Sequence, residues 1–299
     1  MLQTFNPRNA DILVNINGEL VHRDRAGVSP FDSSVQNGDA VWEGLRLYDG
    51  RIFRLEQHLD RLCKSASMLQ YQGVPTREHI KSELWRTLDA NRMRDGVHIR
   101  LTLSRGLKYT SGLDPRVNVG RCALFILAEH KAPVYDKAGL RLITAQHRRP
   151  PTDVLNQHIH ACNQLTSILA KMEANSAGAD DALMLDTRGC LAETNATHIF
   201  IVDSGVVHTS TTVACPEGIT RAAVLELCAR NGIESRERDI TPDELAAADE
   251  MFCTGTMGEL APVTELDGRP VGEGTIGPIT RRLSDAYQVL VRTEGEAFI

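Results

Sequence analysis

The sequence predicts an α+β protein of two domains, and three observations lead to that prediction. The chain has 299 residues, and a length well above about 150 favours two domains. Hydrophobic residues are 42% and charged residues 24%, which is typical of globular proteins and excludes disordered, collagen-like and coiled-coil chains. Both halves of the chain mix short alternating segments with segments of helical periodicity.

The N-terminal domain, expected over residues 1–130, opens on two β-hairpins. Asn17-Gly18 and Asp49-Gly50 are favoured two-residue turns, and alternating apolar segments flank each of them. Apolar residues then recur at helical spacing, and Thr76 is a suitable N-cap for the second of two helices. The remaining elements of this half are helices over 54–69 and 76–91 and strands over 98–103 and 121–127.

Residues 131–139 carry Lys, Pro, Tyr, Asp and Gly without periodicity, which is typical of a connection between domains. The C-terminal domain, expected over residues 140–299, is again mixed. Its expected strands are 140–145, 181–186, 190–193 and 198–202, and its expected helices are 163–177, 219–231 and 276–291.

Charge and composition bear on partners and location. The longest apolar run, Cys122 to Ala128, is too short to span a bilayer, and the first eight residues lack the apolar core of a secretory signal. A net charge of -6 argues against a nucleic-acid partner, which would need a basic face. Seven dispersed cysteines without a C-x-x-C pair predict reduced thiols and a cytoplasmic protein.

Two segments have the composition of anion-binding turns. Gly218-Ile219-Thr220-Arg221 stands directly before a predicted helix, where free backbone N–H groups and the helix dipole favour a phosphate. Its alternative interpretation is simple helix capping. Cys253-Thr254-Gly255-Thr256-Met257-Gly258-Glu259 offers N–H groups and hydroxyls to a phosphate or carboxylate, or else is a tight turn that needs glycine for its backbone angles.

Single side chains add weaker signals. Glu193 at a strand end suits a protonated ring nitrogen, although such carboxylates are more often solvated. Arg61 on a helix and Arg100 within a strand could bind anions in bidentate fashion, although most helix arginines are merely solvated. His158 and His160 stand at i, i+2, but no third metal ligand follows at a suggestive spacing, so a surface loop is the simpler interpretation and no metal is expected.

The order of these segments resembles the class IV aminotransferases, the branched-chain and D-amino-acid aminotransferase family with fold type IV of pyridoxal 5'-phosphate (PLP) enzymes. The similarity covers about residues 12–287, so the resemblance implies the two-domain α+β fold of that family. The matching segments are GDAVWEGLR (38–46), RLEQHLDRL (54–62), ILAKMEAN (168–175), LAETN (191–195), GITR (218–221) and TGTMGELAPV (254–263).

The resemblance also implies roles for residues. Those that would bind the cofactor are Arg61, Gly218, Ile219, Thr220 and Thr256 at its phosphate and Glu193 at its pyridine nitrogen, which Glu193 would keep protonated. Those that would bind the substrate, a small anionic amino or keto acid, are Trp42, Arg100, Gly255 and Met257. The family further implies a homodimer.

One part of the family pattern is missing. The Schiff-base lysine of the family precedes the helix at 163–177, and that position here falls on His158 or on His160. Imidazole transfers protons but forms no imine with an aldehyde, so ordinary transamination is in question. Two hypotheses follow: an aminotransferase-like enzyme that binds PLP non-covalently, or a PLP-independent lyase, isomerase or hydrolase with His158 or His160 as general base. A non-catalytic binding protein is a third.

Overall fold

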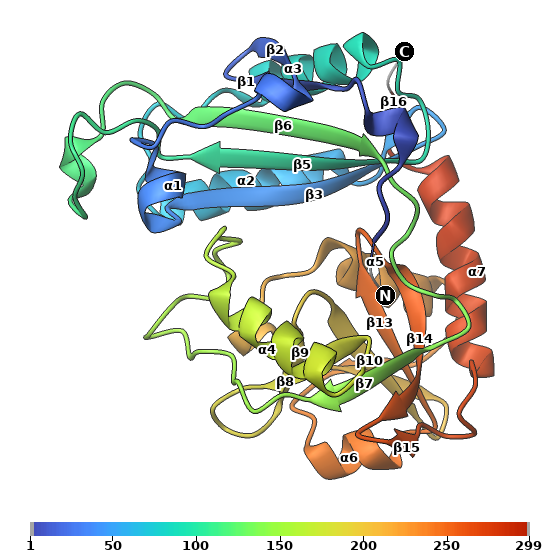
Figure 1. The fold of residues 1–299 in the computed structure, drawn as a ribbon. Helices are drawn as coiled ribbons and strands as arrows, with labels where there is room; N and C mark the ends of the chain where they lie inside the picture. Colours follow the sequence, from blue (N-terminus) through green and yellow to red (C-terminus); the bar gives the residue numbers. More distant parts are fainter. Residues whose placement is uncertain (1–2, 298–299) are drawn as a thin grey trace. The chain divides into compact units, whose positions relative to one another are not determined.

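The computed structural model describes residues 3–297, which form two compact units (Figure 1). The N-terminal unit comprises residues 3–132, Ile159–Asn163 and 291–297; the C-terminal unit comprises Pro133–His158 and Gln164–Leu290. We expected two continuous ranges, whereas two distant segments join the N-terminal unit. The first of them is held by backbone hydrogen bonds, from Trp42 N to His160 O at 3.0 Å and from Cys162 N to Ala40 O at 2.7 Å.

The N-terminal unit is built on an antiparallel seven-stranded sheet with the order β16-β4-β3-β5-β6-β1-β2. The two expected hairpins, β1–β2 and β3–β4, are both present. The strands are β1 (Leu13–Ile16), β2 (Glu19–His22), β3 (Ala40–Tyr48), β4 (Arg51–Ile52), β5 (Val97–Ser104), β6 (Ala123–His130) and β16 (Glu296–Ala297).

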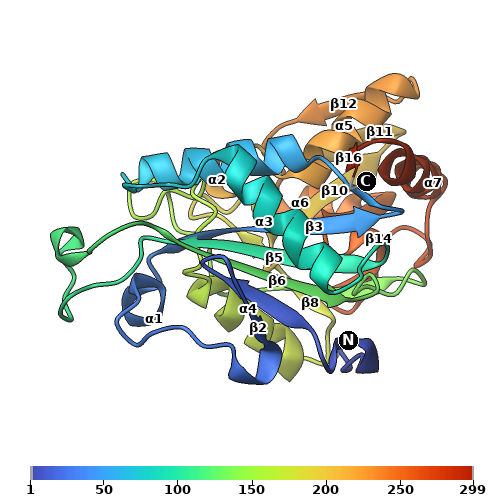
Figure 2. The same cartoon turned by 90° about the horizontal axis from the view of Figure 1, so that it is seen from above.

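Two long helices cover one face of this sheet, as Figure 2 shows from above. They place leucines against strand leucines, so that Leu45, Leu59, Leu84 and Leu101 are fully buried in one apolar core. The Thr76 side chain accepts a hydrogen bond from His79 N at 3.2 Å, which confirms the expected N-cap. The helices are α1 (Ser33–Asn37), α2 (Leu55–Met68) and α3 (Arg77–Ala90), with 3-10 turns η1 (Pro7–Asn9), η2 (Arg23–Arg25) and η3 (Pro115–Val117).

The C-terminal unit has a nine-stranded mixed sheet with the order β12-β11-β10-β13-β14-β7-β8-β9, and β15 pairs with β14. The strand pairs β14–β7, β7–β8 and β11–β12 are parallel. Its strands are β7 (Leu140–Thr144), β8 (Asp181–Leu185), β9 (Leu191–Thr194), β10 (His198–Asp203), β11 (Val206–Thr209), β12 (Ser235–Glu237), β13 (Glu250–Gly255), β14 (Glu259–Leu266) and β15 (Arg269–Pro270). The other elements are α4 (Leu165–Ser176), α5 (Ile219–Arg230), α6 (Pro242–Ala247), α7 (Pro278–Thr293), which runs on into the N-terminal unit, and η4 (Thr212–Ala214).

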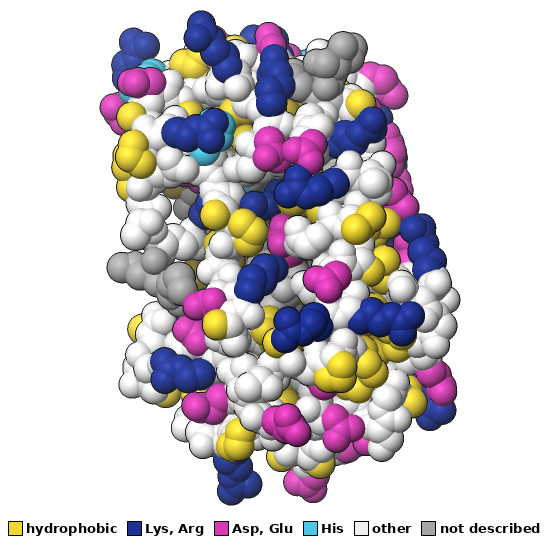
Figure 3. All heavy atoms as spheres, turned by 90° about the vertical axis from the view of Figure 1, so that its right-hand side faces the viewer, with side chains coloured by type: hydrophobic (Ala, Val, Ile, Leu, Met, Phe, Trp, Pro, Cys, Tyr) yellow, Lys and Arg dark blue, Asp and Glu magenta, His cyan; other side chains and the backbone are white. Residues whose placement is uncertain are grey.

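The α+β class is confirmed, and most expected elements agree with the structure to within two or three residues. The misses have local causes. Strand β12 reads Ser-Arg-Glu and has no apolar alternation, and β14 contains Pro262, a residue that argues against a strand. No helix among residues 3–297 is long and apolar enough to cross a membrane. On the face drawn in Figure 3, charged side chains of both signs are interspersed.

The core of the N-terminal unit can be tested with one cavity-forming substitution. Leu59→Ala removes a fully buried side chain from α2 and should lower the free energy of unfolding by about 2–5 kcal/mol. Trp42 and Trp85, the two tryptophans of the chain, both belong to this unit, so tryptophan fluorescence during urea unfolding reports on it. Leu113→Ala, at a side chain 85% exposed, is the matched control and should change stability by less than about 0.5 kcal/mol. Equal effects of the two substitutions would contradict the assigned core.

Candidate functional site

A buried carboxylate, Glu43 on β3, organises one side of the N-terminal unit. Its Oε2 lies 2.7 Å from His58 Nδ1 and 2.7 Å from Arg61 Nη2, and its Oε1 lies 2.8 Å from Arg61 Nε. His160 Nδ1 lies 3.4 Å from Oε1. Burial alone would raise the pKa of Glu43, but Arg61 and His160 together hold it well below its usual range. Glu43 is therefore ionised, and we call Glu43, His58, Arg61 and His160 the Glu43 cluster.

The ring of His160 is fixed from several directions. Its Nδ1 lies 2.6 Å from Trp42 O, its backbone N lies 3.1 Å from Ser65 Oγ, and its ring stacks on Trp42 with centroids 4.4 Å apart. Burial, together with Arg61, lowers the pKa of His160 below its ordinary value. The imidazole is therefore neutral at pH 7. Because a carbonyl oxygen only accepts, Nδ1 carries the hydrogen and Nε2 carries the lone pair.

Several interpretations of these residues are now decided. The solvated alternative for Arg61 is wrong, because its side chain is 11% exposed and binds Glu43 through two nitrogens. The surface-loop alternative for His160 is also wrong, because its side chain is only 14% exposed. His158 belongs to the C-terminal unit, and neither His158 nor His160 lies in a strand, so the two histidines do not share a strand face. Sequence reasoning assigned no role to Glu43 or His58, although both lie inside matching family segments.

The sheet face opposite α2 and α3 gathers positive charge. Arg46 and His98 are register partners on β3 and β5, and Arg100 follows two residues after His98. Arg46 is 3% exposed, and its Nε and Nη1 have no hydrogen-bond partner among the described residues. Burial and the neighbouring charges of Lys131, Arg46 and Arg100 lower the pKa of His98 to about 3. We call Arg46 and Arg100, together with the neutral His98 beside them, the cationic face; the two guanidinium charges suit an anionic group.

Arg100, expected to bind substrate, lies beside Trp42, which was expected to line the pocket. The guanidinium carbon of Arg100 is 3.6 Å from the Trp42 ring centroid, a cation–π contact. Its Nε is 3.3 Å from Thr102 Oγ1 and its Nη2 is 3.5 Å from Cys162 Sγ. Burial lowers the pKa of Arg100 from its ordinary value. The two expected substrate residues of this unit are therefore neighbours, and no carboxylate bonds this guanidinium directly among the contacts described.

In the C-terminal unit Glu193 is buried on β9, and Arg149 Nη2 lies 2.8 Å from its Oε1. Both side chains are 7% exposed, so the solvated alternative for Glu193 is wrong. Arg149 also donates to Thr194 O at 3.2 Å. Sequence reasoning missed Arg149, because it stands in an irregular Arg-Arg-Pro-Pro segment without periodicity.

The N-terminus of α5 carries the first of the two segments that the sequence analysis singled out as anion-binding turns. Gly218 is its N-cap, and no side chain caps the helix. A Cβ on Gly218 would lie 2.4 Å from the His198 ring, so only glycine fits there. His198 faces Thr254 across the β10–β13 pair, and the buried Thr254 Oγ1 has no hydrogen-bond partner among the described residues. The C-terminal unit therefore holds both the backbone N–H groups of Ile219 and Thr220 and the hydroxyl of Thr254, which are groups that can donate to an anion.

The second Gly/Thr segment forms the turn between β13 and β14, with Gly255 paired to Glu259. We expected a tight turn to need glycine for its backbone angles, and that reason is wrong, because neither Gly255 nor Gly258 has a positive φ. Close packing is the cause: added Cβ atoms would lie 2.9 Å from Thr197 and 2.1 Å from the Tyr135 ring, respectively. Thr256 and Met257 lie half-buried in this turn.

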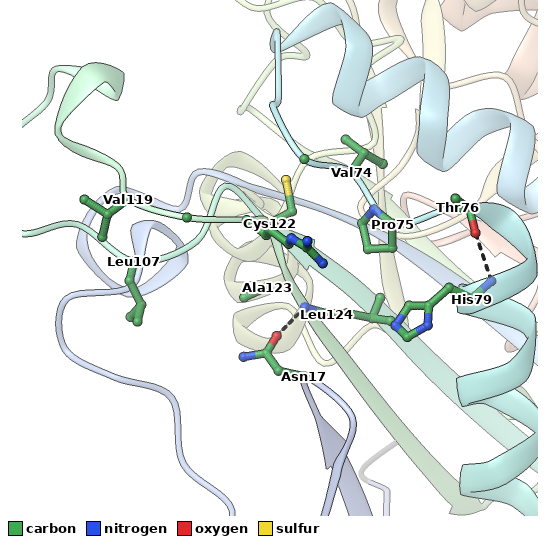
Figure 4. A pocket seen from close by; sticks show the side chains of 13 residues that line it. Asn17, Val74, Pro75, Thr76, His79, Leu107, Val119, Cys122, Ala123 and Leu124 are labelled. Atoms are coloured by element: carbon green, nitrogen blue, oxygen red, sulfur yellow. Dashed lines mark hydrogen bonds between the residues drawn. The ribbon is translucent and has the colours of Figure 1, made fainter.

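A cavity of about 810 Å³ in the N-terminal unit lies apart from all of these residues (Figure 4). Val74, Pro75, His79 and Leu124 are among its lining residues, and none of the residues expected to bind cofactor or substrate lines it. Among residues 3–297, no group of three His, Cys, Asp or Glu side chains could hold a metal ion.

The neutral His98 predicts a pH-dependent stability. Unfolded histidine takes up a proton near pH 6.5, whereas folded His98 stays neutral until about pH 3. The unfolded state is therefore favoured as pH falls below 6.5. From pH 7 to pH 5 the free energy of unfolding should fall by about 1–2 kcal/mol less in His98→Gln than in the wild type. Urea titrations followed by tryptophan fluorescence measure this free energy. The exposed control His79→Gln should lose as much as the wild type; an equal loss in all three proteins would refute the assignment.

The comparisons with known proteins agree on one family. The Amino-transferase class IV model matches residues 40–266. Branched-chain-amino-acid aminotransferase-like protein 2 of Arabidopsis thaliana is 51% identical over 290 residues, which are 97% of this chain and 52% of that protein. This chain thus spans about half the length of the first curated relatives that it matches.

Two further relatives match along nearly their whole length. The branched-chain-amino-acid aminotransferase of Pseudomonas aeruginosa is 34% identical over 296 residues, with 96% of this chain and 95% of that protein covered. The crystal structure of the branched-chain amino acid aminotransferase from Thermobaculum terrenum, in its PLP form, superposes with a TM-score of 0.86 at 28% identity, covering 95% of each chain. The protein therefore belongs to the class IV aminotransferase family.

Proposed function

We propose that this protein is an aminotransferase-type enzyme that binds PLP, or its aminated form, non-covalently and acts on a small amino or keto acid. The observation that carries the proposal is the uncapped N-terminus of α5, where a Cβ on Gly218 would strike His198 and the buried Thr254 hydroxyl lacks a partner among the described residues. These groups fit a phosphate. The Thermobaculum terrenum relative has a PLP form, which supports the same ligand class.

Each expected residue then has a role. In our proposal Gly218, Ile219, Thr220 and Thr256 hold the cofactor phosphate together with the Arg61 guanidinium. Glu193, kept in place by Arg149, holds a proton on the pyridine nitrogen. PLP, when bound, supplies an electron sink for charge that develops at the substrate α-carbon.

The cationic face supports an anionic substrate. Arg46 and Arg100 lie on adjacent strands, and the Arg46 nitrogens named above lack partners among the described residues. A substrate carboxylate would supply charge-assisted hydrogen bonds to these guanidinium groups. His98, neutral at pH 7, adds a donor without further charge. In this proposal Trp42, Gly255 and Met257 line the substrate side of the site, and which amino acid fits is left to assay.

His160 takes the place of the lysine in this proposal, and His158 does not. The Nε2 lone pair of a neutral imidazole accepts a proton near neutral pH, which is the part of the lysine's work that imidazole can perform. It cannot attach the cofactor covalently, so affinity must come from the phosphate and pyridine contacts alone. Slow turnover with easy loss of cofactor is the expected consequence.

The same histidine also supports a second candidate, a PLP-independent lyase, isomerase or hydrolase. Its specific support is the Glu43 cluster, in which a neutral His160 lies next to an ionised carboxylate. In that case His160 is the general base, and the α5 N-terminus holds a carboxylate or phosphate of the substrate itself. Binding of PLP decides between the two candidates.

We further propose a cytoplasmic homodimer. Leu165, Ile168 and Met172 follow helical spacing on α4 and are 62%, 54% and 57% exposed, so this face suits contact with a second copy of the chain. The seven cysteines are free thiols, in keeping with a reducing compartment. Light scattering at micromolar concentration tests the dimer.

Restoring a lysine tests the place of His160. His160→Lys should become covalently attached to PLP, which intact-mass measurement after borohydride reduction detects as a stable adduct. The wild type and the matched control His158→Lys should bind PLP without such an adduct. An adduct on His158→Lys alone would move the lysine position to His158. Absence of PLP binding by calorimetry in the wild type would reject the proposed function in favour of the PLP-independent candidate.

The phosphate cradle has its own test. Gly218→Ala places a methyl group in steric clash with the His198 ring. The substitution should weaken PLP binding at least about tenfold, or ~1.4 kcal/mol, in a calorimetric titration. Gly27→Ala is the control, because a Cβ there meets nothing within 4 Å, and it should bind as the wild type does. Unchanged affinity in Gly218→Ala would remove α5 from the site.

A further inference from the structure

Glu43 is the most enclosed charge of the N-terminal unit. Its side chain is 0% exposed, and His58 and Arg61 bond it directly. The pairing with Arg61 uses both carboxylate oxygens and two guanidinium nitrogens, a fork that fixes the plane of the guanidinium. The two charges cancel, so the cluster is neutral as long as both histidines are neutral.

Hydrogen positions in the cluster follow from the acceptors. Glu43 is ionised and only accepts, so His58 must donate from Nδ1. Trp42 O likewise only accepts, so His160 donates from Nδ1 as well. Both rings therefore carry a hydrogen on Nδ1 and a lone pair on Nε2. A proton added to His160 would leave a net positive charge in a buried place.

Groups from every neighbouring element act on His160. Helix α2 contributes the Arg61 charge and Ser65 Oγ, which accepts a hydrogen bond from the His160 backbone N, and β3 contributes Glu43. Strand β5 contributes Arg100, which contacts both Trp42 and Cys162 beside His160. Of these, Glu43 alone is negative, so its charge is what offsets the arginines around the imidazole.

We propose that Glu43 is the positioning residue of this site: it fixes the guanidinium of Arg61 and sets the basicity of Nε2 on His160. Glu43 acts through these two side chains. The inference rests on the proposed function only for the role of His160 in proton transfer; the electrostatic coupling itself is a property of the N-terminal unit.

This coupling has a sign that can be measured. Glu43→Gln removes the negative charge and leaves Arg61 uncompensated, so the pKa of His160 should fall by about one unit or more. Arg61→Met removes the positive charge and leaves Glu43 uncompensated, so the pKa of His160 should rise by a similar amount. General disorder of the unit would move both values toward that of free histidine and could not separate them in this way.

The experiment is NMR of the full-length protein labelled with 15N-histidine, without cofactor or substrate. His160→Gln identifies the His160 signals, and pH titrations compare the wild type with Glu43→Gln and Arg61→Met. The matched control is Glu83→Gln, a buried glutamate of α3 that bonds Asn15 and Arg86 away from the cluster. We expect shifts of opposite sign in the two cluster variants and none in the control.

Several results would overturn the inference. One is a Glu43→Gln titration of His160 equal to that of the wild type; another is a shift of the same sign in both cluster variants. If a variant does not fold, the NMR spectrum of the wild type still tests the inference. The assigned arrangement puts the hydrogen of His160 on Nδ1, so finding it on Nε2 would contradict that arrangement. Loss of PLP binding in the wild type would reject the proposed function and leave this NMR result standing.

Discussion

Each unit buries a carboxylate–guanidinium pair that includes a residue of its candidate site. Glu43 pairs with Arg61 in the N-terminal unit, and Glu193 pairs with Arg149 in the C-terminal unit. The desolvation of such a pair costs about as much as the attraction returns, so an apolar pair of equal volume would often be as stable. The presence of both pairs is therefore better explained by what they orient than by the stability they contribute.

In our proposal His160 stands in place of the family's lysine, and this changes which chemistry is possible. A lysine combines two functions, a nucleophile that forms an imine and a base that moves a proton. An imidazole keeps only the second. Its usefulness as a base depends on remaining neutral, and the surroundings of His160 favour that, since burial and Arg61 both oppose its protonation. In this proposal the site therefore lacks a covalent anchor and keeps a group suited to proton transfer.

Much of the fold was predictable, because hairpin turns and helical periodicity are local signals. The Asn17-Gly18 turn and the Thr76 cap follow from residue type alone. Partners across the fold were not predictable in this way. Arg149 lies 44 residues before Glu193 in an irregular segment, and no periodicity connects the two. The glycines at 255 and 258 were recognised for the wrong reason, because close packing of Thr197 and Tyr135 arises only once distant segments are folded together.

The short segment Ile159–Asn163 has a consequence for how this protein could evolve or be divided. The chain leaves the C-terminal unit for these five residues, pairs with β3 and then returns. Neither unit is therefore encoded by one continuous stretch of the sequence, so recombination at a single boundary could not exchange a complete unit. A gene fragment encoding residues 3–132 alone would leave the β3 edge without its partner and the carboxylate of Glu43 without its second histidine. The Glu43 cluster thus needs residues 159–163 as well as residues 3–132.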